Sequence, residues 1–220
     1  MRAVILLFAK APIPGRVKTR LQPPLTPHQA ASLHDAFVRD ALQFLAAVPN
    51  VDVELHTDTS TDAWNTPGVA RNLQAAGDLG IKMHSAAEAA LRAGHPRVLI
   101  LGSDSPALPV PHIDALLRSP ADVALGPADD GGYYAIGFRR THPDMFAGVP
   151  WSSPDTLRAT MAACRARGLT VDLGPGWFDV DSPADLVRLL TVPSAGPHTA
   201  AWLAQYGPSL AQGLACLKCR

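Results

Sequence analysis

The sequence predicts an α/β fold, a three-layer sandwich in which helices cover both faces of a mostly parallel central sheet. One observation is that apolar runs of strand length alternate with segments of helical periodicity along most of the 220 residues. The other is that the strongest apolar runs, at 3–8 and 97–103, lack an alternating polar face. Such runs are typical of parallel strands that are buried on both sides.

The amino-terminal quarter is predicted to form a strand, a helix and a second strand. Residues 3–8 are the first buried strand. Thr26 supplies an N-cap and Pro27 a first helical residue, and apolar residues then recur at three- and four-residue spacing to Val48. Residues 51–57 alternate apolar and polar side chains, which predicts a strand with one covered face.

The middle of the chain continues the alternation. The turn at 77–80 introduces a helix at 81–93, which Gly94 closes. The run 97–103 predicts the most strongly buried strand of the chain. Two shorter apolar runs predict strands at 121–125 and 133–138.

The carboxyl-terminal part is predicted to add a helix at 154–167, ended by Gly168, and a strand at 169–173. Ser182 is the predicted N-cap of a helix that ends near residue 190. We therefore expect one catalytic domain at 1–190 and a helical tail at 191–220, with a short helix near 197–206.

Composition and charge limit the classes of partner. The formal net charge is zero, which does not favour nucleic acid or an anionic membrane. Apolar runs stay well short of the roughly 20 residues that span a bilayer, and no secretory signal is evident. Three cysteines are too few for a disulfide framework, so a reducing cytoplasm is expected. They are Cys164 and the terminal C-x-x-C pair, Cys216 and Cys219.

A basic loop follows the first strand. Pro12, Pro14 and Gly15 exclude regular structure there, and the loop carries four cations: Lys10, Arg16, Lys18 and Arg20. Cations at the carboxyl end of a first parallel strand suit a phosphate-rich ligand. A solvated charged turn would have the same composition.

The common nucleotide and hydrolase signatures are absent. Gly15 to Thr19 resembles the end of a phosphate-binding P-loop, but Val17 stands where the second glycine belongs. There is also no G-x-G-x-x-G after the first strand and no G-x-S-x-G elbow. Phosphate would therefore be held by basic side chains, backbone and a metal.

Carboxylates at two strand ends predict a metal site. Asp104 follows the strand at 97–103, and Asp179 and Asp181 precede the last helix of the domain. In an extended segment Asp179 and Asp181 point the same way. Oxygen ligands from two loops, completed by substrate phosphates, suit magnesium. The alternative is that these acids only cap turns or helices, although Ser182 already fills the second role.

A third group of residues lies between the strands at 121–125 and 133–138. Asp130 precedes Gly131 and Gly132, which allow a tight turn and a close backbone approach to a ligand. Tyr133 and Tyr134 then point to opposite faces, so that one packs inward while the other is free to line a pocket. An ordinary Asp-Gly hairpin explains the first glycine but not the second.

These motifs together resemble a known family. In order, the motifs are FAKAPIPGRVKTRL (8–21), GDLG (77–80), GSDSP (102–106), DGGYY (130–134), VPWS (149–152) and DVDSPADL (179–186). The chain resembles a bacterial family of glycosyltransferases with the nucleotide-diphospho-sugar transferase fold, related to the phospholactate guanylyltransferases. The resemblance covers roughly residues 1–190.

The resemblance implies roles for individual residues. It assigns the metal to Asp104 and Asp181, and nucleotide binding to five residues: Lys10, Gly15, Lys18, Arg20 and Ser103. We place the acceptor against Gly131, Gly132, Tyr133 and Trp151, although Trp151 could equally close the core. Asp78 could be a helix cap or a substrate ligand. The basic loop departs from the glycine-rich loop of sugar-nucleotide pyrophosphorylases, so side chains must do more of the phosphate binding.

The expected function is a magnesium- or manganese-dependent transferase. Its partners would be a nucleoside triphosphate or nucleotide-sugar donor and a small-molecule acceptor. In nucleotidyl transfer, Lys18 and Arg20 would stabilise the phosphates and an ionised acceptor would need no base. In glycosyl transfer, an inverting enzyme needs a base, for which Asp130 is the candidate. A catalytically silent nucleotide-binding regulator is the third alternative.

Overall fold

In a computed structural model, which describes residues 2–192 and 196–217, seven strands form one sheet in the order β3-β2-β1-β4-β6-β5-β7. The strands are β1 (Ala3–Ala9), β2 (Val51–Thr57), β3 (Ala70–Leu73), β4 (Val98–Gly102), β5 (Val123–Pro127), β6 (Tyr133–Phe138) and β7 (Val171–Leu173). The helices are α1 (Pro27–Ala46), α2 (Leu79–Arg92), α3 (Val110–Arg118), α4 (Thr156–Ala166), α5 (Pro183–Leu189) and α6 (Pro197–Leu217), with a short 3-10 helix at Thr19–Leu21.

The sheet is mostly parallel, as predicted. β1 pairs in parallel with β2 and β4, β2 with β3, and β5 with β7. Only β6 runs the other way, between β4 and β5. The carboxyl ends of β1, β2, β4 and β5 therefore lie along the same edge of the sheet, where parallel α/β folds bind their ligands.

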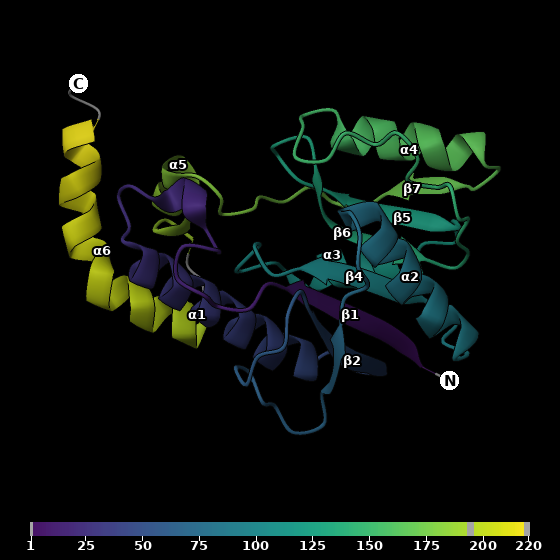
Figure 1. Cartoon of the computed structure of the whole chain (residues 1–220), viewed down its shortest axis with the longest axis horizontal. Coiled ribbons are helices and arrows are strands. Elements are labelled where there is room, and N and C mark those ends of the chain that lie inside the picture. The colour runs from purple at the N-terminus through teal and green to yellow at the C-terminus, as the bar shows by residue number, and fades with distance from the viewer. Residues whose placement is uncertain (1, 193–195, 218–220) are drawn as a thin grey trace.

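Helices cover both faces of the sheet, which confirms the three-layer architecture (Figure 1). On one face, alternate residues of β1 and β4 pack against α2 and α4 in a core that includes Leu6 and Ile100. On the other face, Leu7, Leu99 and their neighbours pack against α1 and α3. β1 and β4 are buried on both sides, which explains their unbroken apolar sequences.

The carboxyl-terminal helix packs against α1 at the end of the molecule opposite α4 and β7 (Figure 1). Trp202 is buried there, and its indole Nε1 donates a hydrogen bond to Ser32 Oγ. α6 runs to Leu217 and is thus longer than the helix expected near 197–206. The C-x-x-C pair lies outside the side chains that the structure describes.

Local capping fixes where the predicted helices begin. Thr26 and Gln29 form a reciprocal capping box at the start of α1, and Ser182 and Asp185 form another at α5. Asp78 caps α2 by accepting a hydrogen bond from Ile81 N, so its role is that of a cap. Among the described helices, none combines the length and apolar character needed to cross a bilayer.

Besides the short 3-10 helix at Thr19–Leu21 in the basic loop, one strand and one helix were not predicted. The strand β3 is exposed along its whole length at the edge of the sheet, so its sequence carries no apolar pattern. The helix α3 follows a proline-rich stretch and begins at Val110, with Pro109 in the N-cap position. Prolines that mark a turn in sequence here mark the first turn of a helix, where their missing N–H costs nothing.

Candidate active site

A cleft of about 590 Å³ opens at the carboxyl edge of the sheet, where β1, β2 and β4 end. It collects seven of the residues that the sequence predicts for ligand or metal binding: Lys10, Lys18, Arg20, Ser103, Asp104, Trp151 and Asp181. Arg16, the fourth cation of the basic loop, also lines the cleft. The rule that parallel strands end at one edge thus correctly brings distant loops together.

The ammonium group of Lys18 lies at the centre of this site. Its Nζ is 2.7 Å from Asp104 Oδ1 and 2.9 Å from Asp181 Oδ1, and it donates a further hydrogen bond of 2.7 Å to Val180 O. These three acceptors match the three protons of the ammonium group, and only 3% of the side chain is exposed. Lys18 therefore bridges the two carboxylates from the buried side of the site.

The backbone of the basic loop is shaped to bring Lys18 inward. Lys18 adopts a left-handed conformation with φ 47°, which is uncommon for a residue with a side chain. Val17 and Leu21 on either side are buried. Apolar anchors, instead of glycines, therefore fix this loop, which explains why Val17 stands where a P-loop has glycine.

The ion pairs of Lys18 outweigh the effect of burial on the pKa values of Lys18 and Asp104. Burial lowers the pKa of Lys18, but the charges of Asp104 and Asp181 outweigh it, so that the net pKa lies above the usual value. Burial likewise works to raise the pKa of Asp104, and the charge of Lys18 outweighs it, holding that pKa below its usual value. Lys18 and Asp104 are therefore both charged at neutral pH.

The two carboxylate loops are also joined directly. Val180 N donates to Asp104 O at 2.8 Å, and the Ser105 hydroxyl donates to Asp179 Oδ1. Val180 itself is buried in the core formed by α1, α5 and α6. Of the two acids of this segment, only Asp181 lines the cleft, whereas Asp179 is held by Ser105. Burial raises the pKa of Asp179 to about 7.

Sequence reasoning missed His34, which reaches the site from α1. Its Nε2 is 2.9 Å from Lys10 O, and its Nδ1 is 3.8 Å from Asp104 Oδ1. Burial lowers the pKa of this imidazole, so it is neutral at pH 7 and donates to the Lys10 carbonyl through Nε2. In sequence His34 is a polar residue on the buried face of a predicted helix, which is a signal that could have identified it.

Four further residues of the cleft were also missed: Asp58, Gln74, Lys82 and Ser152. Asp58 follows β2 and accepts a hydrogen bond from Ala11 N at 2.8 Å, which ties the second loop to the basic loop. Gln74 follows the unpredicted strand β3. The position of Asp58 directly after a strand is the same signal that identified Asp104, and it could have been used.

The glycine turn between β5 and β6 does not line the cleft. Asp130 Oδ1 accepts a hydrogen bond from Gly132 N at 2.8 Å, and Gly131 has φ 88°. A Cβ atom on Gly131 would collide with the Pro154 carbonyl, so this glycine is needed for close packing. Gly15 is likewise outside the cleft lining.

The expectation that one of the paired tyrosines lines the pocket is not met. Tyr133 packs in the core beneath α4, where burial raises the pKa of its phenol. Tyr134 packs on the opposite face, and its hydroxyl donates to Pro175 O at 3.0 Å. Both rings are inside because both faces of the sheet are covered. Trp151 both lines the cleft and packs against Phe146, with ring centroids 5.7 Å apart.

The carboxylates fit a divalent cation. Asp104 and Asp181 each present one oxygen to the same ammonium nitrogen, while 41% and 40% of their side chains remain exposed to the cleft. Among the described residues, no group of three or more His, Cys, Asp or Glu side chains could hold a metal ion. A cation bound here would take its other ligands from phosphate oxygens and water, which is the usual arrangement for magnesium.

Comparison with known proteins identifies the family. Residues 33–153 match the family described as "Uncharacterized protein conserved in bacteria (DUF2064)". The chain belongs to this family. It is also 29% identical over 186 residues to the 2-phospho-L-lactate guanylyltransferase of Methanocella arvoryzae. The matched segment covers 82% of this chain and 79% of that protein.

Solved structures confirm the fold. A candidate nucleotide-diphospho-sugar transferase from Desulfovibrio desulfuricans is 34% identical, with a TM-score of 0.85 over 96% of this chain and 97% of that one. The 2-C-methyl-D-erythritol 4-phosphate cytidylyltransferase of Thermus thermophilus is 17% identical, with a TM-score of 0.51 over 87% of this chain and all of that one. The second likeness shows the fold alone. The expected nucleotide-diphospho-sugar transferase fold is thus confirmed.

Proposed function

We propose that this protein is a magnesium-dependent nucleotidyltransferase that joins a nucleoside triphosphate to a small ionised acceptor and releases pyrophosphate. The relatives support a transferase that uses a nucleotide or a nucleotide sugar. Guanosine triphosphate is the first donor to test, because the Methanocella relative is a guanylyltransferase.

The observation that carries the proposal is the balance of charges in the cleft. Five cationic side chains line it: Lys10, Arg16, Lys18, Arg20 and Lys82. Its two most central carboxylates, those of Asp104 and Asp181, are both engaged by Lys18, so they suit a metal better than proton transfer. Asp130, the base that glycosyl transfer would require, is not among the residues of the cleft. This arrangement favours a polyphosphate donor and an acceptor that needs no base.

In the proposed reaction, an acceptor oxygen forms a bond to the α-phosphorus, and the bond from that phosphorus to the bridging oxygen breaks. Asp104 and Asp181 would hold the magnesium ion, which neutralises phosphate charge when bound. Arg20, Arg16 and Lys10 bind and orient the phosphates. Lys18 acts through the carboxylates, which it keeps at a fixed separation, so it is a positioning residue and not a direct phosphate ligand.

Pyrophosphate release tests the proposal. The protein with GTP, magnesium and a panel of phosphate and carboxylate acceptors should release pyrophosphate, and Asp130→Ala should change the rate less than tenfold. The second candidate, glycosyl transfer, rests on the position of Asp130 in a tight turn at the same edge of the sheet. It predicts release of nucleoside diphosphate from a sugar nucleotide and loss of turnover in Asp130→Ala. Release of neither product would leave the regulator alternative.

Arg20→Ala should weaken nucleotide binding by roughly 1.5–3 kcal/mol, which is typical of a charge-assisted hydrogen bond. Arg20→Lys should also weaken it if the guanidinium binds phosphate through two nitrogens. Calorimetric titration with GTP and magnesium measures both effects. Arg118→Ala is the matched control, because Arg118 forms an exposed pair with Asp114 on α3 and does not line the described cleft. Equal affinity in Arg20→Ala and in the control would indicate a solvated surface turn.

A further inference from the structure

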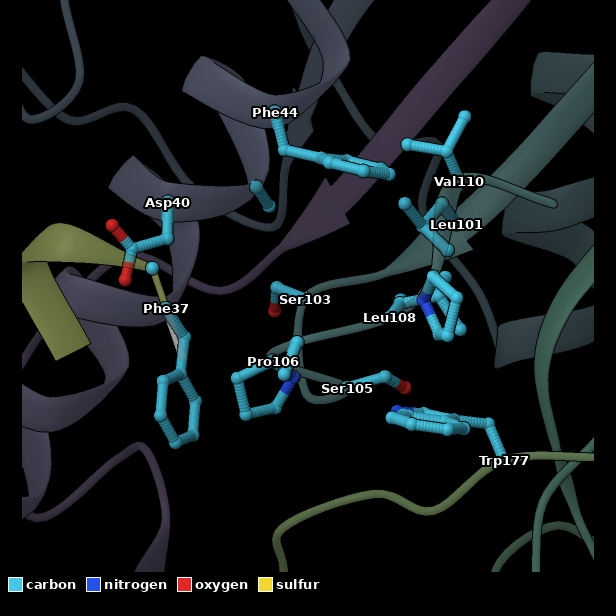
Figure 2. A pocket seen from close by; sticks show the side chains of 15 residues that line it. Phe37, Asp40, Phe44, Leu101, Ser103, Ser105, Pro106, Leu108, Val110 and Trp177 are labelled. Carbon is cyan, nitrogen blue, oxygen red and sulfur yellow. The ribbon is translucent and has the colours of Figure 1, made fainter. Parts of the chain in front are cut away.

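A second, apolar cavity of about 310 Å³ lies against Ser103 and Ser105, the residues on either side of Asp104 (Figure 2). Its walls come from α1, from the loop between β4 and α3, and from the segment before α5. The side chains that dominate it are Phe37, Phe44, Leu101, Leu108, Val110 and Trp177. The volume is at the small end of the range for ligand pockets.

The cavity adjoins the cleft described above. Gly102 and Ser103 line both spaces, so a single stretch of backbone separates them. Ser105 also lines the cavity, and its hydroxyl is bonded to Asp179, two residues before Asp181. A molecule in the cavity would therefore have one end beside the two carboxylates that are proposed to hold the metal.

The cavity offers little charge to a ligand. Asp40 is the only charged residue among its described lining residues. Both Asp40 oxygens already accept hydrogen bonds from the start of α6, at 2.9 Å from His198 N and 2.7 Å from Thr199 N. A charged group that entered the cavity would lack a partner of opposite sign, which is strongly unfavourable in an apolar environment.

One polar group in the wall lacks a partner. Trp177 Nε1 is buried and makes no hydrogen bond with the described residues. Figure 2 shows the indole nitrogen on the side of the ring that faces Ser105 and the cavity. The imidazole of His112 packs edge-on against the Trp177 ring, with 5.4 Å between the two ring centroids. A buried N–H without an acceptor is destabilising, and a ligand oxygen or nitrogen would satisfy it.

We propose that this cavity binds the apolar body of the acceptor, while its ionised head group lies at Ser103 and Ser105 beside the metal carboxylates. This rests on the proposed nucleotidyl transfer. The substrate class is then an acid with an uncharged aromatic or branched aliphatic body, about the size of one ring, that presents a hydrogen-bond acceptor to Trp177. A small acceptor whose body bears further charges would be selected against.

Two phosphate monoesters with the same head group test this assignment. Benzyl phosphate carries a ring, and methyl phosphate does not. The chain has four tryptophans, and Trp177→Phe assigns one indole N–H signal in the spectrum of ¹⁵N-labelled protein by removing it. Benzyl phosphate should shift that signal saturably, with an affinity at least tenfold higher than that of methyl phosphate. It should also do so when GTP and magnesium are saturating, since donor and acceptor must bind together.

A substitution at the mouth of the cavity gives the matched comparison. Val110 is 49% exposed at the start of α3, where an aspartate is tolerated at a helix N-terminus. Val110→Asp should weaken benzyl phosphate binding tenfold or more, because its charge lies at the rim of the cavity. Val187→Asp, at another exposed valine on α5, should leave the binding unchanged.

Three results would overturn the proposal: equal affinity for the two monoesters, unchanged binding in Val110→Asp, or displacement of benzyl phosphate by GTP with magnesium. The last result would make the cavity part of the donor site. If calorimetry detects no GTP binding at all, the acceptor role falls together with the proposed function. The two failures are distinguishable, because the indole signal reports the cavity independently of the nucleotide.

Discussion

Asp104→Asn is expected to abolish the magnesium dependence of nucleotide binding and to lower turnover about a hundredfold, or roughly 2.7 kcal/mol. The asparagine keeps the size of the side chain and one oxygen for Lys18, but it removes the negative charge that a divalent cation requires. Because 41% of the Asp104 side chain is exposed, the fold should be retained, with a stability loss of about 1 kcal/mol. Calorimetric titration of GTP with magnesium and with a chelator measures the dependence.

Asp181→Asn should behave in the same way, since it contributes the second carboxylate to the same ammonium group. Asp114→Asn is the matched control. It makes the same chemical change to an exposed carboxylate that pairs with Arg118 on α3, outside the cleft. If both cleft variants keep the magnesium-dependent affinity of the wild type while the control is also unchanged, the metal assignment is wrong.

The order of the elements and the edge of the sheet that holds the site could be predicted from sequence, because they follow from local patterns. Unbroken apolar runs identified β1 and β4, and capping residues identified the starts of α1 and α5. Residues that follow parallel strands necessarily share one edge, so the meeting of Lys10, Ser103 and Asp104 followed from topology.

The remaining features depend on contacts between residues far apart in the chain. Lys18 was expected to face phosphate. Nothing in the sequence around Lys18 indicates that its ammonium group pairs with two carboxylates, one of which lies 163 residues away in the chain. His34 reaches the site only because the basic loop folds over α1. The apolar cavity is formed by α1 and Trp177, which lie on separate elements and become neighbours only in the folded chain.

The role assigned to Lys18 leads to the second strong prediction. Lys18→Met should destabilise the protein by about 2–3 kcal/mol at neutral pH, because it leaves the carboxyl groups of Asp104 and Asp181 without their shared cation. A residue that only contacted nucleotide phosphates would not affect the stability of the free protein. Urea unfolding in a chelator measures the loss, and Lys82→Met, from the same cleft, should show little of it.

Two conditions should rescue Lys18→Met, and both follow from the same electrostatics. In the wild type, the pKa of Asp104 is depressed, so the stability that it contributes is present at neutral pH and is lost as the pH falls through the native pKa. In Lys18→Met that pKa should lie above its usual value, so acidification towards pH 4 should shrink the difference in stability between the two proteins. Magnesium without nucleotide should also restabilise the variant more than the wild type, because the ion takes the position of the missing charge. A loss of stability that neither acid nor magnesium reduces would instead assign Lys18 to packing alone.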